Sequence, residues 1–226
     1  MKLLSAALSP FAARVRVAIY AKSLPVEIEP ANMFLPSGGK SPEYLALNPM
    51  GKVPTLVLDD GSGLPESDTI VEYLADAFPA AGLRPAKAED ISRVRLLARI
   101  TELYVMSPGG PLFGQLDPET RSAAAMQGGL DGMDQGLGYL EAFMTDDAYA
   151  VGDSITSADC VLAPYLYFFP HLFGQLMGKG SLIDGHAKVS AYWSRVQRDP
   201  AVERVLTEMR EGLAASRLKV LLGEPA

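Results

Sequence analysis

The sequence predicts two parts, an α+β domain followed by an all-helical domain. Two observations lead to this prediction. Short β-branched and apolar runs alternate with helical patterns up to about residue 80, and beyond it apolar residues recur only at helical spacing. Between the two patterns lies a linker rich in Pro, Ala and Gly, at residues 79–85. We therefore expect one domain at residues 1–79 and a second at residues 86–226.

The elements of the first domain follow in order from these runs. Their expected positions are a strand at 2–5, a helix at 10–22, a strand at 26–29, a short helix at 42–47, strands at 53–58 and 63–65, and a helix starting near Ser67. Pro10 favours a helix start, because the N–H that proline lacks is unpaired in a first turn anyway. The turn residues Asp59, Asp60 and Gly61 indicate a hairpin. The first two strands, joined by a crossover helix, should be parallel, and the hairpin antiparallel.

The second domain is predicted to contain only helices. Their expected positions are about 91–106, 118–144, 157–169, 188–198 and 201–215, with a break at the Ser-Pro-Gly-Gly-Pro segment 107–111. Five glycines fall within 118–144, and each exposed glycine inside a helix costs about 0.8–1 kcal/mol relative to alanine. Either another helix packs closely here, or the boundary is wrong. Thr156 and Asp159 have the spacing of a capping box, which predicts a helix start.

The overall composition narrows the classes of function. Of the 226 residues, 48% are hydrophobic and 21% are charged, which is typical of a globular protein. The net charge is −7, and residues 1–80 hold 6 Lys and Arg against 9 Asp and Glu. Because this acidity leaves no basic stripe to neutralise phosphates, we expect no nucleic-acid partner.

Localisation and metal binding are also constrained by the sequence. No apolar run approaches the 18 or more residues of a membrane span, and Arg14 and Arg16 interrupt the N-terminal apolar stretch; we expect a cytoplasmic protein without a membrane partner. The single cysteine, Cys160, rules out an intramolecular disulfide and a cysteine-rich zinc site. It lies in an apolar stretch and is expected to be buried and inert. His171 and His186 offer no ligand pair at helical spacing, so no metal is expected.

Ser9 is the first residue that suggests chemistry, because it follows a strand and precedes a helix. A helix start carries partial positive charge and unpaired backbone donors, so a hydroxyl there can donate to an anion such as a thiolate. Lowering a thiol pKa from near 8.5 by about two units requires roughly 2.7 kcal/mol of selective stabilisation. One charge-assisted hydrogen bond and a helix end supply this order of magnitude. The alternative is that Ser9 only caps the helix.

Two further segments suggest recognition of a peptide with free ends. Val53-Pro54 opens a strand, where proline is either an edge feature or cis; a cis bond would turn the Val53 backbone outward to pair with a peptide. Glu66 and Ser67 open the next helix, where backbone donors and the hydroxyl would hold a carboxylate and Glu66 an ammonium group. The alternative is an ordinary helix cap with exposed acids.

Four segments together resemble the cytosolic glutathione transferase family across nearly the whole chain. Residues 9–15 are similar to the serine motif of the tau and zeta classes, and residues 48–56 to the loop before the family's cis-proline. Residues 65–67 are similar to its γ-glutamyl clamp, and residues 152–159 to the capping motif of its helical domain. The chain is thus identified as a serine-type member, similar to tau, zeta or theta-like bacterial transferases.

The resemblance implies a fold, a ligand and a set of binding residues. It implies a thioredoxin-like N-terminal domain, an all-α C-terminal domain, a homodimer, and glutathione as co-substrate without a metal. Ser9 would stabilise the glutathione thiolate. Val53 would pair with the cysteinyl backbone, and Glu66 and Ser67 would hold the γ-glutamyl end. The complete set expected to bind glutathione is Phe11, Lys40, Lys52, Val53, Pro54, Glu66 and Ser67.

The two lysines carry an alternative of their own. Lys40 and Lys52 would lie near the glycine carboxylate of glutathione, Lys40 on a loop that varies within the family. Each lysine is otherwise read as a solvated surface residue.

The second substrate is expected between Phe11 and the helical domain. An apolar electrophile would suit aromatic walls there, and the alternative is that most of these rings are simply core. The expected electrophile site comprises Phe11, Tyr104, Phe113, Tyr165 and Phe169, with Met106, Phe168 and Phe173 as further candidates.

Three functions fit these residues. The first is conjugation, in which the thiolate held by Ser9 attacks a hydrophobic electrophile. The second is isomerisation of a maleylacetoacetate- or maleylpyruvate-type double bond, for which Arg14, Arg95 and Arg99 could bind the substrate carboxylates. The third is a non-catalytic binding scaffold. Serine at position 9 disfavours thiol–disulfide exchange, since no protein thiol is there to form a mixed disulfide.

Overall fold

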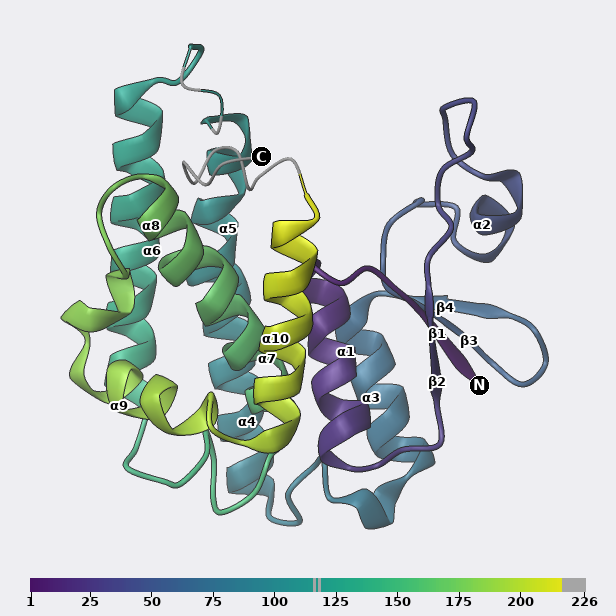
Figure 1. The fold of residues 1–226 in the computed structure, drawn as a ribbon. Coiled ribbons are helices and arrows are strands. Elements are labelled where there is room, and N and C mark those ends of the chain that lie inside the picture. The colour runs from purple at the N-terminus through teal and green to yellow at the C-terminus, as the bar shows by residue number, and fades with distance from the viewer. Residues whose placement is uncertain (116, 118, 217–226) are drawn as a thin grey trace.

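A four-stranded sheet forms the N-terminal part of the chain (Figure 1). The computed structural model describes residues 1–115, 117 and 119–216. The strands are β1 (Lys2–Ser5), β2 (Glu27–Pro30), β3 (Thr55–Val57) and β4 (Gly63–Pro65). They lie in the order β2-β1-β3-β4, with β1 parallel to β2 and antiparallel to β3, and β3 antiparallel to β4. The predicted parallel pair and the predicted hairpin are both confirmed.

Two helices cover the sheet on the side that faces the rest of the molecule. They are α1 (Pro10–Ala21) and α3 (Ser67–Ala77), and Figure 1 shows both between the strands and the C-terminal helices. Leu3 and Leu56 from the sheet pack with Val15 and Ile70 from these helices, all fully buried. The short helix α2 (Pro42–Leu47) matches its predicted bounds. The strand predicted at 53–58 is shorter and spans Thr55–Val57, and the cis peptide bond Val53-Pro54 lies just before it.

Beyond residue 79 the regular elements among the described residues are all helical, as predicted. The longer ones are α4 (Ala88–Ile100), α6 (Ala123–Phe143), α7 (Ser157–Leu166), α9 (Ala187–Val196) and α10 (Pro200–Ala214). Two π-helical segments, η2 (Thr101–Met106) and η4 (Tyr167–Phe173), extend α4 and α7. The short segments are η1 (Pro79–Ala81), α5 (Ser107–Gly109), η3 (Gly110–Gln115), α8 (Gly174–Leu176) and η5 (Leu182–Gly185).

The predicted break at residues 107–111 is wrong. The chain stays helical from α4 through η2, α5 and η3 to Gln115. Proline inside an α-helix clashes with the carbonyl four residues earlier and leaves it unpaired. Here the wider π-helical turns of η2 precede Pro108, and η4 contains Pro170, so each proline falls where the α-helical pattern is already interrupted.

The glycines of α6 are explained by close packing against η2 and α5. A Cβ added at Gly136 would lie 1.8 Å from the Tyr104 carbonyl oxygen, and one at Gly132 would lie 2.7 Å from Pro108 Cβ. Gly128, in contrast, faces open space. Both alternatives raised by the sequence therefore apply, because the helix also begins at Ala123 rather than near residue 118.

The predicted capping box at the start of α7 is present and ties three segments together. The Thr156 N–H donates to Asp159 Oδ2 at 2.9 Å, while the Ala150 N–H and the Tyr192 hydroxyl donate to Asp159 Oδ1 at 2.8 and 3.1 Å. Burial raises the pKa of Asp159, and these hydrogen bonds oppose the rise. The neighbouring Cys160 is fully buried as expected, and burial raises the pKa of its thiol, so the reactive thiolate is suppressed.

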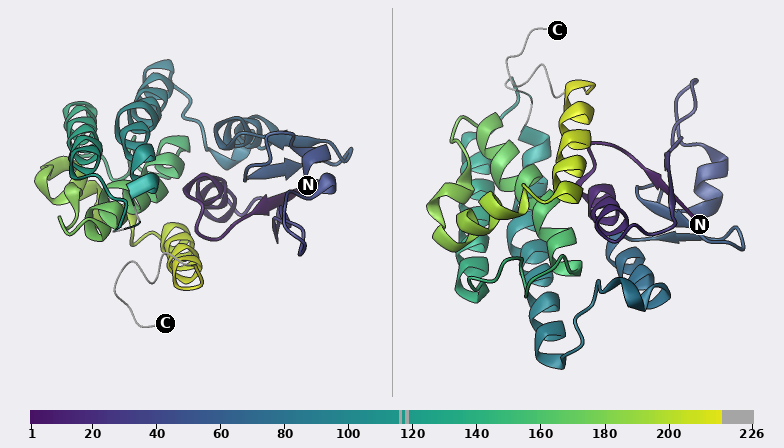
Figure 2. Two further views of the ribbon diagram at one scale, coloured as in Figure 1. Left: turned by 90° about the horizontal axis from the view of Figure 1, so that it is seen from above. Right: turned by 60° about the horizontal axis from the view of Figure 1, so that its bottom comes forward.

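One hydrophobic core joins the sheet side to the helical side. Helix α1 packs against α7 and α10, and Figure 2 shows α10 running beside α1 in both views. The Ser157 N–H donates to the Leu83 carbonyl at 3.0 Å, which fixes the linker to α7. Of the helices described, none combines the length and the apolar character needed to cross a membrane.

Candidate functional site

A cavity of about 420 Å³ lies at the starts of α1 and α3, beside the cis peptide bond. Its lining brings together all eight residues that the sequence assigned to glutathione. The lining residues are Ser9, Phe11, Met33, Lys40, Asn48, Met50, Gly51, Lys52, Val53, Pro54, Glu66 and Ser67. These residues come from four separate stretches of the chain, so the fold and not the local sequence creates the cavity.

Ser9 is the N-cap of α1 and also lines the cavity. Its Oγ accepts a hydrogen bond from the Ala12 N–H at 3.3 Å, and its own N–H donates to the Ala6 carbonyl at 3.1 Å. A hydroxyl has one donor and two acceptor positions. Capping uses an acceptor position only, so the O–H remains able to donate to an anion in the cavity. The capping role and the chemical role of Ser9 are therefore compatible.

Two buried polar side chains hold the turn that contains Val53 and Pro54. The Lys52 carbonyl accepts from the Tyr44 hydroxyl at 2.5 Å and from Asn48 Nδ2 at 2.8 Å. Both side chains also bond Thr55 Oγ1, at 3.0 Å each, just after the cis bond. Sequence reasoning gave Tyr44 and Asn48 no role. The signal was a polar side chain directly before Pro49 and a tyrosine within an apolar helix.

The start of α3 is built without a side-chain cap. Glu66 occupies the N-cap position with a left-handed backbone, φ 68°, and its side chain makes no capping hydrogen bond. Ser67, the first residue of the helix, is buried at the cavity wall. Helix starts leave backbone N–H groups unpaired, and these groups with their dipole form a binding position for an anion. The exposed Glu66 carboxylate supplies negative charge beside that position.

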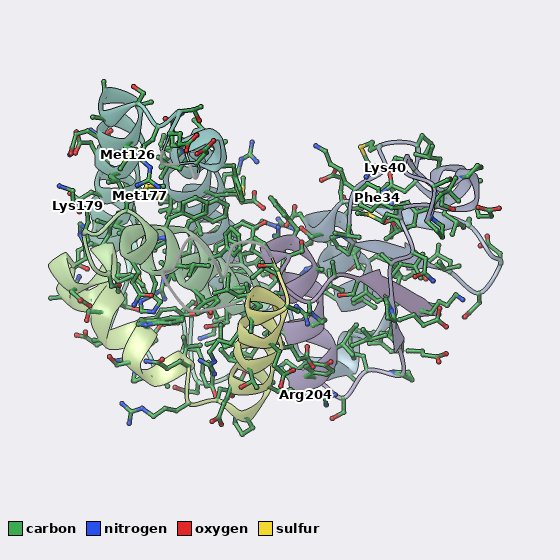
Figure 3. The ribbon with its side chains drawn as sticks, turned by 45° about the horizontal axis from the view of Figure 1, so that its top comes forward. Phe34, Lys40, Met126, Met177, Lys179 and Arg204 are labelled. Carbon is green, nitrogen blue, oxygen red and sulfur yellow. The ribbon has the colours of Figure 1, made fainter. Side chains whose placement is uncertain are left out.

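Two lysines add positive charge to the lining of the cavity. Lys40 Nζ donates to the Gly51 carbonyl at 2.6 Å and lies 4.3 Å from the centre of the Phe34 ring (Figure 3). A β-bridge between Phe34 and Lys40 keeps this arrangement within a small hairpin-like loop. Lys40 is thus not a freely solvated lysine. Lys52 contributes an exposed side chain to the same lining.

The aromatic residues expected to bind an electrophile are divided between core and surface. Phe11 is 38% exposed and packs edge-on against Tyr165, which in turn contacts Phe169. Tyr165 and Phe169 are buried, as are Phe168 and Phe173, so these rings are largely core. Burial raises the pKa of the Tyr165 hydroxyl to about 12.

The chain of aromatic contacts that starts at the exposed Phe11 reaches the surface again at Phe113. Phe113, which is exposed, packs edge-on against the buried Phe169, so the row of contacts runs from Phe11 to Phe113. Tyr104 is also exposed, but it packs against Tyr139 and lies outside this row.

The arginines considered for binding substrate carboxylates lie elsewhere. Arg14 is buried and pairs with Asp68 and with Glu102, the latter at 2.6 Å. Burial lowers the pKa of Arg14, but its interactions with Tyr165, Asp68 and Glu102 raise it by more, so the net direction is upward. Arg14, Arg95 and Arg99 all line a separate cavity of about 290 Å³, which shares no lining residue with the cavity at Ser9.

Comparisons with known proteins agree with this architecture. Residues 3–82 match the model for the glutathione S-transferase N-terminal domain, and residues 123–192 match that for the C-terminal domain. The probable glutathione S-transferase GSTU6 of Oryza sativa is 30% identical, with 98% of this chain and 94% of the relative covered. The chain belongs to the glutathione S-transferase family.

Two further relatives help to place this family member. An apo structure of a glutathione S-transferase III is 29% identical and superposes with a TM-score of 0.74, covering 91% of this chain and 95% of that one. A maleylacetoacetate isomerase of Pseudomonas aeruginosa is 31% identical over 74% of this chain and 80% of its own length. The fold predicted from the sequence, a thioredoxin-like domain followed by a helical domain, is confirmed.

Proposed function

We propose that this protein conjugates the thiolate of glutathione to a hydrophobic electrophile, with Ser9 stabilising the thiolate. The observation that carries the proposal is the position of Ser9, whose hydroxyl keeps its donor while lining the cavity at the start of α1. A thiolate there would receive one charge-assisted hydrogen bond and the field of the helix end. Together these match the roughly 2.7 kcal/mol that a two-unit fall in thiol pKa requires.

The charges around the cavity fit glutathione in one orientation. Its γ-glutamyl carboxylate would lie at the uncapped start of α3 with Ser67, and its ammonium group beside Glu66. The Val53 backbone, which lines the cavity, would pair with the cysteinyl unit. The glycine carboxylate would then lie near Lys40 and Lys52. This orientation directs the thiol towards Ser9 and Phe11.

The electrophile would bind where Phe11 faces the helical domain. Phe11 and Phe113 offer exposed aromatic surface, and Tyr165 and Phe169 support them from beneath. Tyr104 would contribute as a more distant wall residue. Aromatic surfaces of this kind favour flat apolar electrophiles through area burial and ring stacking.

Several broader properties accompany this proposal. We propose a cytoplasmic homodimer acting in detoxification, with domain bounds near residues 79 and 86. Exposed apolar side chains on α3, α4 and η2 support an association between copies; they are Tyr73, Leu96 and Leu103. The expectation of no metal also remains part of the proposal.

A second candidate is isomerisation of a maleylacetoacetate-type substrate, which the Pseudomonas aeruginosa relative favours. That reaction needs cationic groups for the carboxylates of the substrate as well as those of glutathione. Arg14 is already paired with two acids, and neither Arg95 nor Arg99 lines the cavity at Ser9. Conjugation is therefore the better supported of the two. Turnover of maleylacetoacetate or maleylpyruvate at a rate above that with a chloronitroaromatic would reverse the order.

The experiment that tests the proposal compares two serine caps. Ser122 caps α6 with the same geometry as Ser9, its Oγ accepting from the Ala125 N–H at 3.3 Å, but it lies outside the cavity. Ser9→Ala should lower turnover of a chloronitroaromatic about 100-fold, while Ser122→Ala should not. Both variants lose a cap, so a stability effect alone would appear in both. Equal turnover in the two variants would remove Ser9 from the mechanism.

Glutathione binding itself separates the enzyme from a scaffold. A ligand that binds only the native state raises the melting temperature by mass action. We expect such a rise in both serine variants with millimolar glutathione. Its absence in the unaltered protein would favour the non-catalytic alternative.

A further inference from the structure

The turn that carries Ser9 lies against α10, a helix from the other end of the chain. A Cβ added at Gly212 of α10 would lie 2.7 Å from the Leu8 N and 3.0 Å from the Ala7 Cβ. Real Cβ atoms do not approach backbone nitrogen so closely, so the turn would have to shift. Alanine is favoured over glycine inside helices. The contact with the turn is thus the feature of this position that calls for glycine.

Arg16 binds the same turn through a hydrogen bond to its backbone. Its side chain is almost fully buried, with Nη2 donating to the Ala7 carbonyl at 2.6 Å and Nη1 paired with Glu208 of α10 at 2.5 Å. Glu208 also accepts from the Tyr20 hydroxyl at 2.8 Å. The guanidinium of Arg204, a residue of α10 labelled in Figure 3, stacks over the Tyr20 ring at 3.8 Å and completes this contact between α1 and α10.

The two contacts act on the same peptide unit, the one that joins Ala7 to Leu8, just before Ser9. Arg16 binds the carbonyl of Ala7, and Gly212 lies against the N–H of Leu8. The turn closes one residue later, where the Ser9 N–H donates to the Ala6 carbonyl. A shift of the Ala7–Leu8 peptide therefore changes the position of Ser9 relative to the cavity. Glu66, Ser67 and Val53 belong to other segments and would not move with it.

We propose that Arg16 and Gly212 are positioning residues, through which α10 sets the distance between the Ser9 hydroxyl and the bound thiolate. This inference rests on the proposed function of Ser9. Neither residue lines the cavity at Ser9, and both line a separate groove between β2 and α10. They act on the chemical step and leave the recognition of the tripeptide to the rest of the site.

The test compares Gly212→Ala with Gly128→Ala, the same change at a helix position that faces open space. In Gly212→Ala we expect turnover to fall roughly ten- to hundredfold, the range in which small misplacements affect catalysis. The pKa of the bound glutathione thiol, followed by thiolate absorbance, should rise towards its free value. The KM for glutathione should stay unchanged. Gly128→Ala should change none of these quantities.

Arg16→Lys is a second variant that remains informative if Gly212→Ala does not fold. Lysine keeps a positive charge for Glu208, but it lacks the planar fork that serves Glu208 and the Ala7 carbonyl together. We expect the variant to fold, with a raised thiol pKa and reduced turnover at unchanged KM. A folded Gly212→Ala or Arg16→Lys with unaltered thiol pKa and turnover would overturn the inference alone. An unaltered protein that binds glutathione without ionising its thiol would overturn the proposed function, and the inference with it.

Discussion

The starts of α1 and α3 face the same cavity but are built in opposite ways. At α1, Ser9 has an ordinary extended backbone and its side chain caps the helix. At α3, Glu66 has a left-handed backbone and its side chain caps nothing. In the first arrangement, one backbone N–H of the helix is paired with the Ser9 side chain, and the Ser9 hydroxyl can still donate its own hydrogen bond. The second leaves the backbone donors themselves available.

This difference shows how one structural device can serve two kinds of anion. A thiolate needs one short contact from a single donor, because its charge resides on one atom. A carboxylate has two oxygens and is better matched by several backbone donors together with a neighbouring hydroxyl. The capped helix therefore suits the reacting sulfur, and the uncapped helix suits the end that is only held.

The largest expected loss of stability comes from removing Arg14, whose ion pair with Asp68 connects α1 to the start of α3. Arg14 of α1 pairs with Asp68 in the first turn of α3 and with Glu102 of η2, so it fixes the two helices relative to each other. Arg14→Met should lower the free energy of unfolding by about 3 kcal/mol, because it leaves the half-buried Glu102 without its closest partner. Urea denaturation would measure this loss.

Arg99→Met is the matched control for that prediction. Arg99 pairs with the same carboxylate at 3.6 Å, but its side chain is 67% exposed. An exposed pair of this kind contributes only about 0.2–1 kcal/mol. Similar losses in the two variants would show that burial of Arg14 adds nothing to the strength of its ion pairs.

The next effect should separate binding from chemistry at the two helix starts. Glu66→Gln removes the charge proposed to pair with the ammonium group of glutathione, and hydrogen bonds to charged groups contribute about 1.5–3 kcal/mol. We expect KM for glutathione to rise about tenfold or more while kcat is largely kept, the reverse of Ser9→Ala. Steady-state kinetics at saturating electrophile would measure both constants.

Glu89→Gln provides the control for this change. Glu89 is an exposed acid in the first turn of α4, away from the cavity. It should leave KM unchanged. If Glu66→Gln instead lowered kcat at constant KM, the division of labour between α1 and α3 would be wrong.

The sequence predicts an element well when nearby residues determine it, and poorly when packing against distant residues determines it. The bounds of α2 and β4 were predicted to the residue, because Pro42 and the turn at residues 59–61 are local signals. The break expected at residues 107–111 was wrong, because its local glycine and proline signals were overridden by packing of η2 and α5 on α6. The glycines of α6 could be noticed in the sequence, but their partner could not.

The same rule applies to the candidate site. Ser9, Glu66 and Ser67 stand at helix starts that the sequence reveals, and the structure places them at one cavity. No local sequence pattern indicates that Phe169 is buried or which groups Arg16 contacts, because both depend on residues far away in the chain. Sequence therefore located the atoms proposed to touch glutathione better than those that hold them in place.

The smallest expected effect tests whether the unusual backbone of Glu66 is kept for binding at a cost in stability. A left-handed backbone destabilises the folded state of a non-glycine residue by about 1–3 kcal/mol, and glycine removes this strain. Glycine also makes the unfolded chain more flexible, which cancels part of the gain in stability. Glu66→Gly should therefore raise the free energy of unfolding by about 1 kcal/mol while raising KM for glutathione. Ser23 has φ 48° on the exposed turn after α1, so Ser23→Gly should give a smaller stabilisation with KM unchanged. Loss of stability in Glu66→Gly would mean that the side chain stabilises the helix start in some other way, and the contrast between capped and uncapped helices would weaken accordingly.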